Sequence, residues 1–425
     1  MRRRLSADVS NVLRIVTTEA KAGMRLAIPV FHPTVPGQVL LRAGYELEPR
    51  SIKRLRDLGV RTLWVAIPEL AFLSAHTSPE IIRRQAAVVG HISKLFDGFR
   101  QSIDAELEYS AYAGAVTGLI EAFEADPTAA VMVDRIARAS DEELEHASTV
   151  CYLSTLMGLK LAWYLEHQRP RVSVARAREV VPLGIAGMLH DIGVVRMTDA
   201  QRRSVRENQD PLNEDFRAHV EIGYSAIKGR VPPTVAAAVL NHHQRYDGTG
   251  FPQRTKADGR VEPVAGEQIH IHPRIIAAAD SFDRLSMTGD TEQPRVRVLR
   301  AMLRGERASW FDPTVVHALL AVCPPYAPGA RVTLSNRMHG VVVGWDARNP
   351  CKPRVRRLDP NDPCSVPEGP TIDLAETTGI CVAEIDGHDV GRDNFYPEHD
   401  NEFCLDSQAR RLHNAAEESR ARAAG

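Results

Sequence analysis

The stretch PLGIAGMLHDIG, residues 182–193, decides the fold of this chain. Its apolar residues predict a helix that begins at Pro182, because proline is well tolerated in the first turn of a helix. This helix delivers His190 and Asp191 side by side, and Gly193 ends the turn. Adjacent helical residues point about 100° apart, so the two side chains could bind one ion each, or Asp191 could bridge two ions. A His-Asp pair alone is weak evidence, since an exposed helix end would look the same.

Histidines are concentrated around this stretch. A second element is Asn241-His242-His243, at the end of a helix predicted over 231–240, followed by the Gly-rich loop 246–252. It offers two ligands and a backbone that can approach a phosphate closely, although such a loop taken alone is more often a turn. Imidazole together with carboxylate suits Fe, Mn, Zn or similar divalent ions. Eight of the 16 histidines lie between residues 146 and 272: His146, His167, His190, His219, His242, His243, His270 and His272.

Three structural regions are predicted around this centre. Helical spacing begins at Ser78-Pro79-Glu80, where a capping hydroxyl, a proline and an acid start a helix, and it continues to about residue 322. After Pro324-Pro325, short runs separated by Asn-Pro, Asp-Pro and Gly-Pro turns predict strands. The predicted division is a small α+β N-terminal domain over 1–76, a helical domain over 77–324, a small β-rich C-terminal domain over 325–405 and a charged tail over 406–425.

Neither terminal region contains a catalytic constellation. Short aliphatic runs bounded by Gly and Pro predict strands, and apolar residues at helical spacing predict a helix. The charged tail is expected to be a loose helix or disordered. The predicted elements are strands at 12–16, 39–41 and 62–65 and a helix at 51–58 in the N-terminal region, and strands at 330–334, 340–345 and 354–358 in the C-terminal region.

Composition excludes several classes of protein. The chain has 425 residues, which at roughly 150 residues per domain suggests about three domains. Its 53 Lys+Arg against 54 Asp+Glu argue against binding a nucleic-acid polymer, because such proteins need excess positive charge. No apolar stretch approaches about 18 residues and no signal-peptide core is present, so a cytoplasmic location without a membrane is expected. No CxxC pair occurs, so reduced thiols are expected at Cys151, Cys323, Cys351, Cys364, Cys381 and Cys404.

Five segments in the same order resemble HD-GYP proteins, a branch of the HD phosphohydrolase superfamily. They cover about residues 136–322. His190-Asp191-Ile192-Gly193 resembles the HD motif, and Asp247-Gly248-Thr249-Gly250-Phe251-Pro252 resembles the DG(S/T)GYP loop with Phe in place of Tyr. The other three segments are Glu142 with His146, His219-Val220-Glu221-Ile222-Gly223 and Ala279-Asp280-Ser281-Phe282-Asp283.

The resemblance implies a site with two or three divalent metal ions, with Fe or Mn favoured. Asp191 would bridge two ions and, with His190, form the catalytic centre. Asp247, Gly248, Gly250, Phe251 and Pro252 would contact substrate. Glu142 lies one helical turn before His146, at the place where family members with three metals bind the third ion. The implied ligands are Glu142, His146, His190, Asp191, His219, His242, His243 and Asp280.

HD-GYP proteins are known as phosphodiesterases for cyclic di-GMP, a bacterial second messenger. The resemblance therefore implies a cytoplasmic, bacterial, metal-dependent hydrolase that acts on a cyclic dinucleotide. Phosphodiester hydrolysis needs a nucleophile at neutral pH and stabilisation of charge on the phosphoryl oxygens, and two ions roughly 3.5–4 Å apart can supply both. The implied architecture is multi-domain and mainly α, with an all-helical HD-GYP domain between a small α+β domain and a small β-rich domain.

Three departures from the family pattern favour a second hypothesis. Val194 stands where the family usually has a Lys, Phe251 lacks the Tyr hydroxyl, and residues 285–290 lack the family's Arg-Pro-Tyr segment. The alternative is a weak or inactive sensor that binds metal and nucleotide and signals through protein partners, with homodimerisation left open. Asp283 is expected to be structural, paired with Arg274 or Arg284, while His167, His270 and His272 are expected at the surface or packed in turns. The candidate replacement cations are Arg196, Arg202, Arg245 and Arg284.

Overall fold

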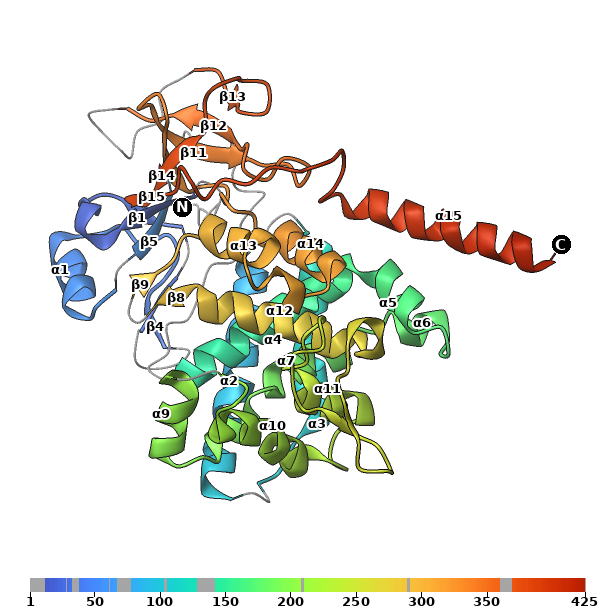
Figure 1. The fold of residues 1–425 in the computed structure, drawn as a ribbon. Coiled ribbons are helices and arrows are strands. Elements are labelled where there is room, and N and C mark those ends of the chain that lie inside the picture. The colour runs from blue at the N-terminus through green and yellow to red at the C-terminus, as the bar shows by residue number, and fades with distance from the viewer. Residues whose placement is uncertain are drawn as a thin grey trace.

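The computed structural model describes residues 12–27, 29–32, 38–60, 62–66, 78–102, 105–127, 142–207, 210–288, 291–359 and 369–424. Within these ranges the chain is mainly helical with several small β-sheets, which confirms the predicted fold class in this general form (Figure 1). The helices form the body of the molecule, and the three-stranded and six-stranded sheets lie together at one end of it.

The N-terminal region is a small sheet with one helix. A three-stranded antiparallel sheet has the order β1-β5-β2, and β3 pairs with β4. Helix α1 buries Ile52 and Leu55, which are three residues apart and so lie on one face. The strands predicted at 12–16, 39–41 and 62–65 and the helix at 51–58 are confirmed. The elements are β1 (Val12–Val16), β2 (Arg25–Leu26), β3 (Val30–Phe31), β4 (Val39–Leu41), α1 (Pro49–Asp57) and β5 (Thr62–Ala66).

The helical region begins where the sequence predicted. The Ser78 side chain accepts a hydrogen bond from the backbone N–H of Ile81 and caps α2. The helices are α2 (Pro79–Gln101), α3 (Tyr109–Ala125), α4 (Glu142–Lys160), α5 (Ala162–Gln168), α6 (Val174–Ala177), α7 (Val181–Leu189), α8 (Ile192–Val195), α9 (Asp199–Glu207), α10 (Glu214–Ile227), α11 (Pro233–Asn241), α12 (Ile271–Leu285), α13 (Arg295–Arg304) and α14 (Pro313–Val322). Two short hairpins interrupt them, β6 (Arg254–Thr255) with β7 (Val261–Glu262), and β8 (Met287–Thr288) with β9 (Thr291–Glu292).

Helix α4 lies at the centre of this region and packs against α2, α7, α12 and α14 (Figure 1). Its approach to α7 is close because glycines face it. A Cβ added at Gly187 would lie 3.1 Å from the backbone oxygen of Val150, and one at Gly184 would lie 2.6 Å from the Thr155 hydroxyl. The close approach brings the first turns of α4 near the end of α7, where His190 lies.

The C-terminal sheet is packed on both faces. Consecutive strand residues point to opposite faces, and Val341 and Val342 are both fully buried. Val342 belongs to the core of the helical region, whereas Val341 belongs to the core of the N-terminal region. The sheet therefore lies between the two other regions, and its core is continuous with both. The boundaries at 76, 324 and 405 stay a prediction.

This sheet has six strands in the order β13-β12-β11-β10-β14-β15. The predicted strands at 330–334, 340–345 and 354–358 are confirmed as β10, β11 and β12. The tail forms helix α15 (Leu405–Ala424), which projects from the body (Figure 1). The strands are β10 (Arg331–Leu334), β11 (His339–Gly344), β12 (Arg354–Arg357), β13 (Ile372–Asp373), β14 (Val382–Ile385) and β15 (His388–Asp389).

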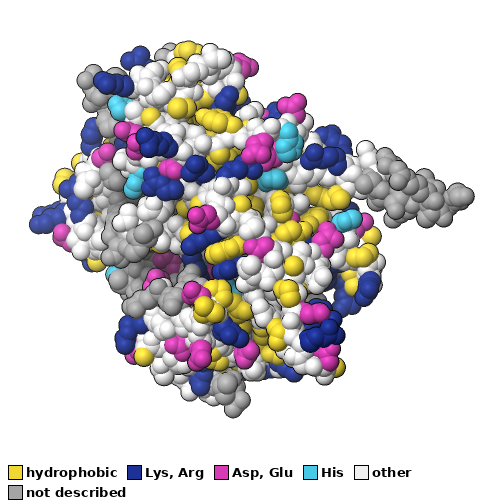
Figure 2. Space-filling model, in the orientation of Figure 1, with side chains coloured by type: hydrophobic (Ala, Val, Ile, Leu, Met, Phe, Trp, Pro, Cys, Tyr) yellow, Lys and Arg dark blue, Asp and Glu magenta, His cyan; other side chains and the backbone are white. Residues whose placement is uncertain are grey.

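The surface carries no continuous field of one charge sign on the face seen in Figure 2, where basic and acidic side chains are interspersed. Among the described helices, none combines the length and apolar character needed to span a membrane. The five cysteines in the described part of the chain are free thiols, and Cys364 lies outside it.

Two motif glycines meet where α8 crosses α10. A Cβ added at Gly193 would lie 2.0 Å from the backbone oxygen of His219 and 2.8 Å from the backbone nitrogen of Gly223. No side chain fits there, and a backbone cannot move as a flexible side chain can. Gly193, two residues after Asp191, therefore sets the separation between Asp191 and His219.

We expect Gly193→Ala to lower the free energy of unfolding by about 2 kcal/mol or more, because overpacking forces backbone shifts. Thermal unfolding of the purified variant measures this. Gly90→Ala is the matched control, since its added Cβ meets nothing within 4 Å and alanine favours a helix. Equal stability of the Gly193 and Gly90 variants would contradict the close contact.

Candidate metal centre

Six elements bring the predicted ligands together. His146 lies near the start of α4, His190 caps the end of α7, and Asp191 immediately precedes α8. His219 lies on α10 and Asp280 on α12. His242 and His243 follow α11. The exposed fraction of His190, His219 and His242 is 0%, so all three imidazoles are removed from solvent.

The side chains form two groups that can each hold an ion. His146, His190 and Asp280 form one group, and Asp191 with His219, His242 and His243 forms the other. Asp191 lies between them: its Oδ1 is 3.3 Å from His219 Nε2, while its Oδ2 is 3.6 Å from His190 Nε2. One carboxylate therefore faces both groups, as a bridging ligand must.

Hydrogen bonds from Nδ1 to the backbone orient two of these imidazoles, so that their Nε2 atoms point into the centre. His190 Nδ1 lies 2.8 Å from the carbonyl of Gly187, and His242 Nδ1 lies 2.7 Å from the carbonyl of Val239. A carbonyl can only accept, so each Nδ1 donates and each neutral ring keeps its lone pair on Nε2. Such outward bonds typically orient histidines that bind metals.

The inward-facing nitrogens converge on a common point. His219 Nε2 lies 3.3 Å from His242 Nε2 and 3.1 Å from His243 Nε2. Cis ligands at about 2.1 Å from one ion lie about 3.0 Å apart, which matches these separations. The buried Asp191 Oδ1 has no hydrogen-bond partner among the described residues. The donor set therefore fits divalent ions.

Burial keeps most of these histidines neutral. It lowers the pKa of His190 to about 3 and that of His219 to about 4. Burial also lowers the pKa of His243 well below its usual range. For the Asp191 carboxyl, burial acts to raise the pKa, but His190 and Arg284 hold it well below its usual range. The centre therefore combines neutral imidazoles with ionised carboxylates, which are the protonation states that bind metal.

His146 differs because two carboxylates contact it. Burial and the charge of Arg284 act to lower its pKa, but hydrogen bonds with Asp280 and Asp283 raise the pKa to about 9. His146 Nδ1 lies 2.7 Å from Asp283, and His146 Nε2 lies 3.0 Å from Asp280. Without metal, the ring is therefore protonated at neutral pH.

Asp283 has the structural role that the sequence predicted, and its carboxylate lies 2.7 Å from His146 Nδ1. Of the two arginines expected to pair with it, Arg274 forms a buried ion pair with Asp312 at 2.6 Å. For Arg284, burial acts to lower the pKa, but nearby carboxylates, Asp283 among them, raise it. Asp283 thus orients the His146 imidazole and adds negative charge near Arg284. The signal was present in the sequence, because Asp280 and Asp283 are three residues apart and share one face of α12.

Arg284 is the cation that enters the centre. Its Nε lies 2.6 Å from Asp280 Oδ1, and its Nη2 forms an ion pair with Asp191 Oδ2. The guanidinium therefore joins one carboxylate of each group. The other three candidate cations lie elsewhere: Arg196 donates to the carbonyl of Phe99, Arg202 pairs with Asp199, and Arg245 stacks on Trp310 at 3.4 Å.

Glu142 is the predicted ligand that the structure does not bring to the centre. Its side chain is 76% exposed and lies 3.4 Å from Arg206. It belongs to neither group of ligands among the described residues. The arrangement described here therefore provides ligands for two ions and places none for a third ion at Glu142.

The loop predicted to contact substrate also supports the ligands. The Phe251 ring packs 5.0 Å from the ring of His243. Asp247 accepts hydrogen bonds from Thr249 and from Ser309, so its carboxylate braces the loop. Gly248 has a φ of +84°, and a Cβ added at Gly250 would lie 2.3 Å from the backbone nitrogen of Arg245. Pro252 follows Phe251 at the end of this loop.

The remaining histidines lie outside the two groups. His167 and His270 are exposed, as expected, and His270 caps α12, which begins two residues before Pro273. His272 differs from the prediction of a surface or turn position, since its exposed fraction is 0%.

Residues 175–315 match a protein-family model described as the HD domain. The chain is 26% identical over 347 residues to a cyclic di-GMP phosphodiesterase of Pseudomonas aeruginosa, covering 74% of this chain and 78% of that protein. It is also 37% identical over 150 residues to a cyclic di-GMP phosphodiesterase response regulator of Xanthomonas campestris, covering 33% of this chain and 36% of that protein. The chain contains an HD domain, and its motifs resemble those of the HD-GYP branch.

Two further proteins resemble this chain. One is a 3'3'-cGAMP-specific phosphodiesterase of Vibrio cholerae, 29% identical over 143 residues, which are 32% of this chain and 25% of that protein. The other is a solved HDG"Y"P protein of Bdellovibrio bacteriovorus, with a TM-score of 0.43 and 13% identity over 73% of this chain and 99% of that one.

Val194, the departure in the HD-GYP motif itself, is buried. Its exposed fraction is 4%, and it packs in a small apolar cluster with Val205, Phe216 and Phe251. A lysine there could not reach the centre without breaking this cluster. The side chain of Val194 therefore packs α8 against Val205 of α9 and against Phe251 in the loop that contacts His243.

We expect metal binding to release about one proton per chain from His146 near pH 7, because a metal must displace the proton that Asp280 and Asp283 stabilise. The affinity for metal should therefore rise with pH up to about 9 and fall as pH decreases. Calorimetric titration of the metal-free protein in buffers of different ionisation enthalpy measures the proton count. Asp283→Asn should reduce this proton count, and an unchanged count in both proteins would exclude the assignment to His146.

We expect Arg284→Ala to destabilise the metal-free protein by about 3 kcal/mol, because it removes the guanidinium that pairs with two buried carboxylates, Asp191 and Asp280. The same variant should gain more thermal stability from added Mn²⁺ than the wild type does, since the guanidinium no longer competes for Asp191 and Asp280. Melting curves with and without metal measure both effects. Arg217→Gln, an exposed arginine on α10, is the control.

Proposed function

We propose that this protein is a metal-dependent phosphodiesterase that hydrolyses a cyclic dinucleotide, with cyclic di-GMP as the favoured substrate, in bacterial second-messenger signalling in the cytoplasm. The observation that carries the proposal is the convergence of seven ligands into two adjacent groups that share Asp191. Two of the relatives are named for cyclic di-GMP and one for 3'3'-cGAMP, which supports a cyclic dinucleotide as the class of substrate.

The chemistry follows from this donor set. Two Fe or Mn ions would supply a nucleophile at neutral pH and neutralise charge on the phosphoryl oxygens. The Nδ1 atoms of His190 and His242 donate outward to carbonyls, so Nε2 of each ring is free to act as a ligand, and Nε2 of His219 faces the same centre. The carboxylate of Asp191 lies between the two groups of ligands. His190, Asp191, His219 and His242 are buried, so bulk water does not surround them. No serine or cysteine nucleophile is required.

Arg284 gives the centre a cation that lies near Asp191 and Asp280. We infer that it replaces the lysine absent at position 194 as the donor to a substrate phosphate. The loop 247–252 would contact the substrate through its backbone, because the carboxylate of Asp247 is already occupied by Thr249 and Ser309.

A second candidate function is a sensor that binds metal and nucleotide without turnover and signals through protein partners. Two features favour the sensor. The buried Val194 offers no cation to a substrate phosphate, and Arg284 occupies carboxylate oxygens of Asp191 and Asp280 that would otherwise bind metal. The two functions share a binding site and differ in turnover.

We expect metal-loaded protein to linearise cyclic di-GMP and Asp191→Asn to reduce turnover at least about 10³-fold, since it removes the charge shared by both groups of ligands. Chromatographic detection of the linear product measures turnover, and metal analysis reports the ions bound per chain. Asp258→Asn, an exposed aspartate in the turn between β6 and β7, is the control.

The outcomes separate the two functions. Fully metallated protein that binds cyclic di-GMP but hydrolyses no cyclic dinucleotide would establish the sensor. Protein that retains turnover in the Asp191→Asn variant would contradict the shared carboxylate as the basis of catalysis.

A further inference from the structure

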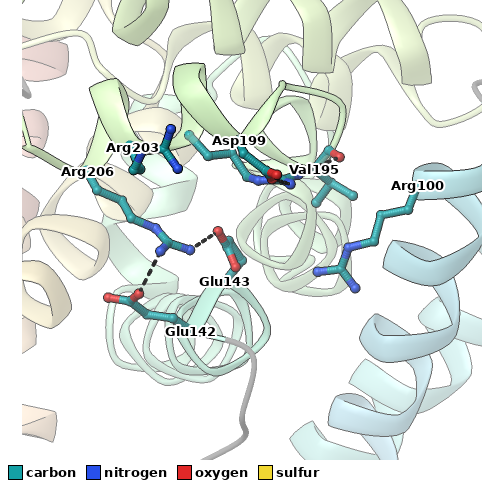
Figure 3. A pocket seen from close by; sticks show the side chains of 8 residues that line it. Arg100, Glu142, Glu143, Val195, Asp199, Arg203 and Arg206 are labelled. Carbon is teal, nitrogen blue, oxygen red and sulfur yellow. Dashed lines mark hydrogen bonds and ion pairs between the residues drawn. The ribbon is translucent and has the colours of Figure 1, made fainter.

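An arginine-rich pocket is lined by residues of α2, α4, α8 and α9 (Figure 3). Its volume is about 620 Å³, within the roughly 300–1,000 Å³ typical of small-ligand sites. Four guanidiniums and three carboxylates line it, and Val195 is an apolar member of the lining. The polar lining residues are Arg100, Glu142, Glu143, Asp199, Arg202, Arg203 and Arg206.

Helix α9 supplies most of this charge from one face. Asp199, Arg202, Arg203 and Arg206 are spaced by three, one and three residues, which places them along one side of a helix. The face is held in place because Val205, on the same helix, packs into the apolar cluster that contains Val194. The substitution that removed a cation from the HD-GYP motif thus helps to position other cations nearby.

The guanidiniums of the pocket are not equally engaged. Arg206 forms ion pairs with Glu142 and Glu143, which Figure 3 marks as dashed lines, and Arg202 pairs with Asp199. Arg203 is exposed and forms no hydrogen bond or ion pair with any residue that the structure describes. Arg203 can therefore bind an anion without breaking an existing pair.

Helices α4 and α8 connect the pocket to the metal centre along the chain. Glu142 and Glu143 lie on α4 about one helical turn, roughly 5.4 Å, before His146. Val195 ends α8, the short helix that begins directly after Asp191. A ligand held at the metal centre could therefore extend along α4 and α8 into the pocket.

We propose that this pocket binds the second phosphodiester of the cyclic dinucleotide while the first lies at the metal centre, with Arg203 as its principal donor. This inference rests on the proposed function and adds the residues that would distinguish a dinucleotide from a single phosphodiester. The two phosphates lie on opposite sides of the macrocycle, so one phosphate at the metal centre directs the other away from it. A guanidinium offers a planar pair of donors to phosphate oxygens, which lysine cannot match.

Substituting Arg203 tests the proposal. Arg203→Gln should raise KM for cyclic di-GMP at least about tenfold, because one charge-assisted hydrogen bond is lost. The change should appear in KM and in the calorimetric Kd more than in kcat, and the metal content per chain should equal that of the wild type. Arg217→Gln removes the same charge from α10, outside the pocket lining, and should leave all three values unchanged.

The outcomes distinguish this inference from the proposed function. A wild-type KM and Kd in the Arg203→Gln variant would overturn the pocket assignment while leaving the phosphodiesterase intact. If the wild type binds cyclic di-GMP without hydrolysing it, the calorimetric comparison still tests Arg203. A wild type that neither binds nor hydrolyses any cyclic dinucleotide overturns both.

Discussion

The buried carboxylate of Asp191 is the constraint on which the rest of the helical region depends. Its two oxygens face two groups of imidazoles, and only 6% of the residue is exposed. A buried charge is stable only when it is paired or binds a cation, so the surrounding helices must deliver partners to fixed positions. The close packing of α4 on α7 and the glycine contact between α8 and α10 satisfy this requirement.

Arg284 explains how the same site remains stable before metal binds. Its guanidinium neutralises Asp191 and Asp280, and His146 carries a proton between Asp280 and Asp283. Divalent ions held by Asp191, Asp280 and the imidazoles would replace that proton and would compete with Arg284 for the same carboxylates. The centre is therefore a set of anions with two alternative sources of positive charge, and the balance between these sources determines the affinity for metal.

The β-rich C-terminal sheet is structurally bound to the helical region, although it supplies none of the predicted ligands. Val341 and Val342 bury opposite faces of one strand against two different cores. Short runs of β-branched and aliphatic residues, bounded by Gly, Pro or Asn, predicted the strands of this sheet. They could not predict that both faces would be covered, since a buried strand shows the same apolar residues whatever packs on it.

The sequence by itself, through five segments that resemble HD-GYP motifs in their order, predicted the seven candidate metal ligands that the fold brings together. It also singled out Gly193 and Phe251 as motif residues. It could not show that Gly193 packs against the backbone of His219 or that Phe251 packs against the imidazole of His243. Only the tertiary structure decided that Asp283 supports His146, that Arg284 reaches the ligands and that Glu142 faces Arg206 instead. These contacts join residues that are 64 to 137 positions apart or depend on which way a long side chain turns, and no local spacing records either. The arginine-rich pocket has the same origin, because α2, α4, α8 and α9 form it only after they pack.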